Sequence, residues 1–159
     1  MTIVKMFVLA VAIAFAAPAV AQEAGNMTME ILKEKVKADK KLVVATNMNL
    51  TDAEAKAFWP LYDGYQKELE QINQRLMNTI KSYADAYNAG KGMIPNETAK
   101  KLLAEVLGVE ESEVKLRQTY ATKLEAVLPA TKVARYLQME TKIRAIVKFE
   151  LARQIPLVQ

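Results

Sequence analysis

The sequence predicts an all-helical protein, and three observations support this fold class. Beyond the first residues, no stretch alternates apolar and polar side chains for long with the period of two that a strand shows. Apolar residues instead recur at intervals of three and four, which is the spacing of one face of an α-helix. Glycine and proline, the strongest helix breakers, number only five each.

The first 21 residues are typical of a secretory signal peptide. Lys5 precedes an apolar run over residues 6–17, and Ala19-Val20-Ala21 supplies the small-x-small pattern of a cleavage site. A membrane anchor is the alternative, but this run falls short of the about 20 apolar residues that a spanning helix needs. We expect export to the periplasm and cleavage after Ala21, which leaves residues 22–159 as a single helical domain.

Two helix starts follow in the N-terminal half. A first helix is expected over about residues 28–46, with a wide lysine face, and residues 47–49, with asparagine at both ends, break it. The second helix is expected to begin at Thr51, which can cap it, because Glu54 three residues later completes a capping box. Leu50 can pack onto the first turn as a hydrophobic staple.

The second helix contains a proline in its third turn. A proline in a helix interior removes one hydrogen bond and costs about 3 kcal/mol. However, the apolar phase runs unbroken across Pro60, and from Phe58 to Tyr87 it follows a repeat of eleven residues, which is typical of a nearly straight long helix. We therefore expect a kink at Pro60, with Gly64 one turn later, after which the helix continues to residues 88–90.

Two further helices complete the predicted architecture. The third is expected from Asn96, read as a capping residue, to Pro129, and its similar length predicts an elongated antiparallel hairpin with the second. The last, over about residues 130–154, is apolar around more of its circumference, which is typical of packing on two sides. Gln138 and Glu140 lie among its apolar residues, so we expect an internal ion pair with a partner such as Arg135 or Arg144.

The composition excludes most catalytic chemistry. The chain has no cysteine and therefore no thiol nucleophile. It also has no histidine, which is the commonest general base and the commonest metal ligand. It also has no glycine-rich phosphate loop, and the carboxylates of residues 110–113 fit a solvated helix face. Met27 and Met29 could form a soft copper(I) site, but a frayed N-terminus is the simpler interpretation. We expect no enzyme, no cofactor and no metal.

Positive charge is concentrated at the C-terminal end. Without Lys5 the chain has 21 basic and 18 acidic residues, a net charge of +3, and residues 131–159 hold six basic residues against two acidic ones. In an exported protein this favours an anionic membrane surface or an acidic partner rather than nucleic acid, although a solvated face is the simpler alternative. The candidate basic residues for binding are Arg135, Lys142, Arg144 and Lys148.

Aromatic residues supply the other candidate protein-binding surface. Phe58, Trp59 and Tyr62 cluster near the start of the second helix, and aromatic rings with polar tips suit adaptable contacts with unfolded chains. Trp59 and Tyr62 fall off the apolar stripe, so we expect them to be exposed or to form a dimer seam. The remaining tyrosines of the two hairpin helices lie in the stripes that build the hairpin core, namely Tyr65, Tyr83, Tyr87 and Tyr120.

Two helix starts resemble a paired family motif. Leu50-Thr51-x-x-Glu54 and Leu128-Pro129-x-x-Lys132 are similar to the paired Leu-Thr-x-x-Gln motif of the Spy and CpxP group of bacterial periplasmic proteins. Three positions depart from it, because Glu54 and Lys132 replace the glutamines and Pro129 replaces the second threonine. The resemblance implies a small helical protein, typically a curved antiparallel dimer, that acts as an ATP-independent chaperone or as an accessory protein in envelope or metal stress.

Two limits apply to that resemblance. Its zinc-linked members depend on histidines, which this chain lacks. Residues 57–65 and 128–158 also look like a set of exported helical proteins that has no assigned biochemical activity.

Together these patterns favour a binding protein. We expect a homodimeric, ATP-independent, chaperone-like or envelope-stress protein that binds unfolded or envelope proteins through an apolar and aromatic helical surface with basic edges. The alternative is a structural or signalling accessory that docks on one specific envelope partner and has no chaperone activity.

Overall fold

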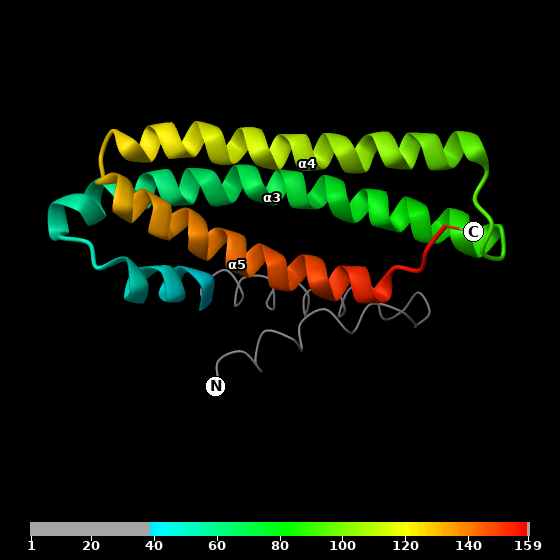
Figure 1. Ribbon diagram of the computed structural model, residues 1–159, viewed down its shortest axis with the longest axis horizontal. Helices are drawn as coiled ribbons and strands as arrows, with labels where there is room; N and C mark the ends of the chain where they lie inside the picture. Colours follow the sequence, from blue (N-terminus) through cyan, green and yellow to red (C-terminus); the bar gives the residue numbers. More distant parts are fainter. Residues whose placement is uncertain (1–38, 159) are drawn as a thin grey trace, which may run out of the picture. The chain divides into compact units, whose positions relative to one another are not determined.

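The structure is a computed structural model that describes residues 39–158 (Figure 1). Every regular element in this range is an α-helix: residues 39–48, α3 (Asp52–Ala89), α4 (Asn96–Glu125) and α5 (Ala130–Gln154). The predicted all-α class is confirmed. The predicted signal peptide, the first part of the helix expected over 28–46, and Met27 and Met29 lie outside the described residues. Within residues 39–158, no helix combines the length and apolarity needed to cross a membrane.

Helix α3 begins as its sequence predicts. The Thr51 hydroxyl accepts a hydrogen bond from the backbone N–H of Glu54 (3.3 Å), and the Glu54 carboxylate accepts one from the backbone N–H of Thr51 (2.8 Å). This reciprocal capping box satisfies two N–H groups that the helix leaves without a partner. From there α3 continues without interruption through Pro60 to Ala89, so the proline does not end the helix. The kink at Pro60 stays a prediction.

Glycine 64 has a packing role between helices. A Cβ atom at this position would lie 2.7 Å from the Tyr120 hydroxyl oxygen, closer than side-chain atoms approach one another. The missing side chain therefore lets Tyr120 of α4 pack directly against the backbone of α3. This close approach accounts for a glycine in the middle of a helix without any appeal to flexibility.

The turn between α3 and α4 is short, and two of its residues have positive φ angles. Lys91 and Gly92 have positive φ angles of 53° and 99°, and the Gly92 N–H donates to the Tyr87 carbonyl oxygen at 2.8 Å. Helix α4 then starts at Asn96 as expected, but Pro95 occupies the N-cap position and makes no side-chain capping bond. Helix α4 ends at Glu125, before Pro129, because residues 126–128 form a turn.

Helices α3 and α4 lie side by side within one compact unit, residues 50–138 with 155–158 (Figure 1). The Arg75 guanidinium donates to the Ser112 hydroxyl (3.2 Å) and to the Glu105 carboxylate (3.3 Å). Nearer the start of α3, the rings of Tyr65 and Tyr120 meet edge to face at 5.4 Å.

A second compact unit combines residues 39–49 with residues 139–154. Val44 and Met48 are fully buried there. The buried carboxylate of Glu140 accepts a hydrogen bond from the Lys40 ammonium at 2.8 Å. The internal ion pair expected for Glu140 is confirmed, with Lys40 as a partner, whereas Gln138, expected to be buried beside it, is exposed.

Candidate functional site

The two motif-like helix starts meet in the unit formed by residues 50–138. The Lys132 ammonium at the start of α5 donates to the Glu54 carboxylate at 2.6 Å, the same carboxylate that closes the capping box of α3. This hydrogen bond, together with the one from the backbone of Thr51, holds the pKa of Glu54 below its usual value. The ion pair therefore joins the starts of two helices that are 78 positions apart in the chain.

The other motif residues also have structural surroundings. Leu128 is buried, Leu50 is half-buried and Pro129 is exposed. The Pro129 carbonyl oxygen accepts hydrogen bonds from the N–H groups of Lys132 (2.9 Å) and Val133 (3.1 Å), which closes the first turn of α5. A proline suits this position, just before a helix, because the ring fixes φ and the position needs no N–H donor.

Six aromatic rings form one connected cluster beside this ion pair. Phe58 meets the Trp59 ring at 5.0 Å and the Tyr136 ring of α5 at 5.2 Å, both edge to face. Tyr136 also contacts Tyr65 at 5.8 Å, and Tyr65 leads on to Tyr120 of α4. Edge-to-face pairs are a favoured arrangement of aromatic rings, so this cluster is a packed core that joins α3, α4 and α5.

The exposure predicted for Tyr62 is wrong, because Tyr62 is only 3% exposed. Phe58, which lies on the apolar stripe, is 0% exposed, and Trp59 is half-buried. The apolar stripe of α3 was read as facing one neighbouring helix, but the ring of Tyr136 on α5 packs against both Phe58 and Tyr62 (5.2 and 6.0 Å). A second neighbour widens the buried side of α3, and Tyr62 falls within the added width.

The hydroxyl groups of two tyrosines in the cluster form hydrogen bonds at its edge. The Tyr120 hydroxyl donates to the Glu68 carboxylate at 2.7 Å, and the Gln66 amide donates to the Tyr136 hydroxyl at 3.3 Å. Burial raises the pKa of Tyr120 to about 12, and the neighbouring carboxylate adds to the shift because it disfavours a phenolate. The Tyr120 hydroxyl is therefore harder to deprotonate than that of a free tyrosine.

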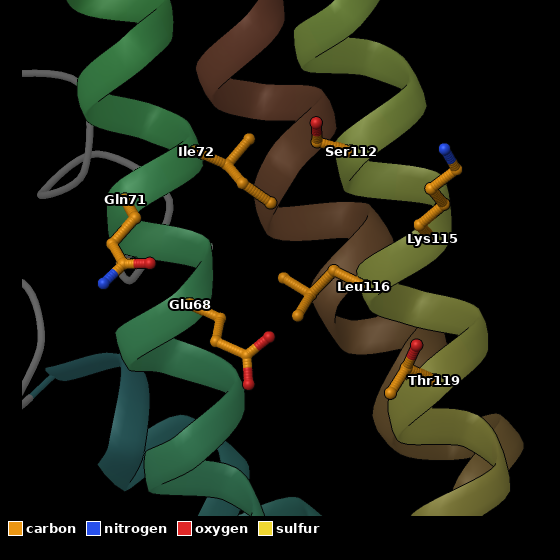
Figure 2. A pocket seen from close by; sticks show the side chains of 7 residues that line it. All are labelled: Glu68, Gln71, Ile72, Ser112, Lys115, Leu116 and Thr119. Carbon is orange, nitrogen blue, oxygen red and sulfur yellow. The ribbon is translucent and has the colours of Figure 1, made fainter.

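A shallow groove of about 290 Å³ runs between α3 and α4. Figure 2 shows Glu68 and Ile72 of α3 and Leu116 of α4 directed into the space between the helices. The Glu68 carboxylate accepts from Tyr120, and the Ser112 hydroxyl at the other end of the groove donates to the Gly108 carbonyl oxygen at 2.7 Å. In the part of the chain that the structure describes, no group of three or more acidic side chains is placed to hold a metal ion.

Exposed apolar side chains lie on a different side of α4. Leu103, Leu107 and Val114 are 60%, 55% and 42% exposed, and spacings of four and seven residues place them along one side of the helix. We call these three residues the α4 stripe. Sequence reasoning followed the buried stripe of α4 and missed them, although apolar residues next to a complete core stripe are a usable signal.

The basic candidates on α5 differ in exposure. Arg135, Lys142 and Lys148 are exposed, and Arg144 is half-buried. Ile146 and Phe149 are exposed as well, so the prediction that α5 packs its apolar residues on two sides is wrong for these two. Ile146, Val147 and Phe149 therefore face outward beside the cations, whereas Leu151 is half-buried.

Known proteins do not decide the function. No protein-family model, curated protein or solved structure matches this chain. The proposals below therefore rest on the exposed surfaces of residues 39–158.

Proposed function

We propose that this protein is a periplasmic, non-enzymatic binding protein that holds unfolded or envelope proteins without ATP. The observation that supports this is the α4 stripe, in which three large apolar side chains lie along one side of a long helix and remain 42–60% exposed. Exposed apolar residues grouped in this way mark surfaces that contact other proteins. The buried aromatic cluster supports the stripe from within, by anchoring α4 to α3 and α5.

The surroundings of the stripe suit contacts with varied polypeptides. Exposed charges of both signs flank it, including Lys100, Glu110, Glu111 and Lys115. A surface of mixed sign has little preference for clients of one charge. Weak selectivity is what a general chaperone requires.

The size of the stripe argues for more than one copy in the working assembly. Fully burying a leucine or valine contributes about 1.5–3 kcal/mol, so three half-exposed side chains contribute at most about 5 kcal/mol. That amount corresponds to a dissociation constant of about 0.2 mM, too weak for a single stripe to hold a client. Two linked stripes would bind far more tightly through effective concentration, and we therefore propose a homodimer.

The arrangement of α3 and α4 is part of the same proposal. We propose that α3 and α4 form an elongated antiparallel hairpin that bends at Pro60. The contacts of Arg75 with Ser112 and Glu105 support the hairpin, and the missing N–H donor of Pro60 inside a continuous helix supports the bend. A bend near the helix start would turn the aromatic end of α3 relative to the rest.

Aggregation of unrelated client proteins tests the proposal. The purified protein should delay heat-induced aggregation of several clients at near-stoichiometric ratios and without nucleotide. Replacing Leu103 and Leu107 by serine should remove most of this protection, because both side chains are exposed and their loss leaves the core intact. Leu42→Ser, at another exposed leucine, is the matched control and should protect as the unmodified protein does. Equal protection by the double serine variant would contradict a role for the stripe.

A second candidate function is an accessory protein that docks on one specific envelope partner. The rigid packing of α4 favours this alternative, since a straight stripe on a well-packed helix also fits a single complementary groove. The two functions differ in the same assay. Failure with every unrelated client, together with capture of one envelope protein that the double serine variant does not capture, would decide for the accessory role.

A further inference from the structure

The C-terminal part of α5 exposes cations without exposed carboxylates. Residues 139–154 contain two acids, and neither is in the exposed class: Glu140 is 2% exposed and pairs with Lys40, and the half-buried Glu150 side chain is 16% exposed and pairs with Arg153 at 3.2 Å. Lys142, Lys148 and Arg153 are all exposed in the same segment. The exposed charged side chains of this segment are therefore all cations, and Glu150 offsets part of the charge of Arg153.

Two apolar side chains lie between two of these cations along one side of the helix. Lys142, Ile146, Phe149 and Arg153 follow at intervals of four, three and four residues, which places them in one row. Ile146 is 42% exposed and Phe149 is 62% exposed. The Arg153 guanidinium lies 5.9 Å from the centre of the Phe149 ring. We call these four residues the α5 face.

We propose that the α5 face is a peripheral docking surface for bilayers that contain anionic lipids. In this arrangement Ile146 and Phe149 enter the boundary between headgroups and acyl chains, while Lys142 and Arg153 lie among the lipid phosphates. A helix that carries cations beside apolar and aromatic side chains binds the interface plane by combining apolar burial with electrostatic attraction. Single-sign charge distinguishes this face from the α4 stripe, whose flanks carry both signs.

This inference goes beyond the proposed function, because it concerns where the protein works and does not depend on client binding. Two different helices carry the two surfaces, so each can be removed alone. The leucine-to-serine double variant of the α4 stripe should still bind vesicles, and variants of the α5 face should still delay aggregation.

Sedimentation with lipid vesicles tests the proposal. The purified protein should sediment with vesicles of mixed phosphatidylcholine and phosphatidylglycerol and stay in the supernatant with pure phosphatidylcholine. Binding should be largely lost near 1 M salt, where the Debye length falls to about 3 Å. Equal binding to both vesicle types, or binding insensitive to salt, would overturn the proposal.

Two variants locate the surface. Neutralising Lys142 and Arg153 together to glutamine should weaken vesicle binding about 25-fold, since each cation near an anionic surface contributes about fivefold. Phe149→Ser should weaken it further without changing its salt dependence. All three side chains are exposed, so circular dichroism should show the same helicity as in the unmodified protein.

The matched control removes the same charge elsewhere. Lys100 and Lys101 changed together to glutamine lower the net charge equally but leave the α5 face intact, so vesicle binding should change little. An equal loss in this control would show that net charge alone explains binding and would overturn the assignment to α5. If the Lys142 and Arg153 variant binds vesicles normally but loses binding to polyglutamate, the face recognises acidic polypeptides and the lipid proposal is wrong.

Discussion

Two phenylalanines provide a direct test of which aromatic residues form the core. Phe58 is 0% exposed and Phe149 is 62% exposed, yet both lie in helices. Truncating a buried phenylalanine to alanine costs about 3–5 kcal/mol. Phe58 also contacts three other rings, at 5.0, 5.2 and 5.9 Å, and such pairs contribute about 0.5–1.5 kcal/mol each beyond their buried area. We therefore expect Phe58→Ala to lower the free energy of unfolding by about 4–5 kcal/mol, and Phe149→Ala by less than about 0.5 kcal/mol.

Urea unfolding followed by circular dichroism measures this difference. With an m-value of about 2 kcal/mol per molar urea, the loss at Phe58 lowers the midpoint by about 2 M, and the loss at Phe149 lowers it by less than about 0.3 M. If Phe58→Ala fails to fold, Phe58→Leu keeps most of the volume and should cost about 1–2 kcal/mol. Equal midpoints for the two alanine variants would refute the placement of Phe58 in the core and would indicate that its side chain is exposed.

Three further outcomes follow from named ion pairs and hydroxyls. The raised pKa of Tyr120 means that its contribution to stability is present below about pH 10 and is lost as the pH rises toward 12, so Tyr120→Phe should remove one tyrosine that titrates above pH 10 from an ultraviolet absorbance titration. Lys40→Met should lower the free energy of unfolding by about 3 kcal/mol, because it takes an ammonium partner from buried Glu140, whereas replacing both residues by methionine should cost much less in the same urea assay. The lowered pKa of Glu54 means that its contribution is present above its usual pKa of 4.5 and is lost as the pH falls from there through the lowered pKa, so Lys132→Met should flatten the decline of stability below that pH.

Local sequence signals predicted the helices and several of their ends. The capping box of Thr51 and Glu54 spans three residues, and the start of α4 at Asn96 follows a turn containing two glycines. Features of this kind are decided by residues within one helical turn of each other, so a single sequence contains the information. The continuation of α3 through Pro60 was predicted from the apolar phase, in which successive positions are only three or four residues apart.

Pairing between distant segments could not be predicted in the same way. Tyr62 is buried because Tyr136, on another helix, packs against α3 from a second side. The apolar periodicity of α3 does not reveal this contact. The buried Glu140 was recognised from its apolar neighbours, but its partner Lys40 is 100 positions away and resembles every other lysine in its helix. A local pattern shows that a buried charge needs a partner without showing which residue supplies it.

The paired helix starts show how such a long-range contact changes the meaning of a local motif. Glu54 and Lys132 occupy the two positions at which the chain carries a charge where the resembled motif has glutamine, and the structure joins them at 2.6 Å. The two departures are opposite in sign and meet in one ion pair, so each charge accounts for the other. Glu54 also keeps the capping box, which glutamine could close equally well, whereas only a carboxylate can pair with the ammonium of Lys132. Capping therefore explains why position 54 is polar, and the contact with α5 explains why it is charged.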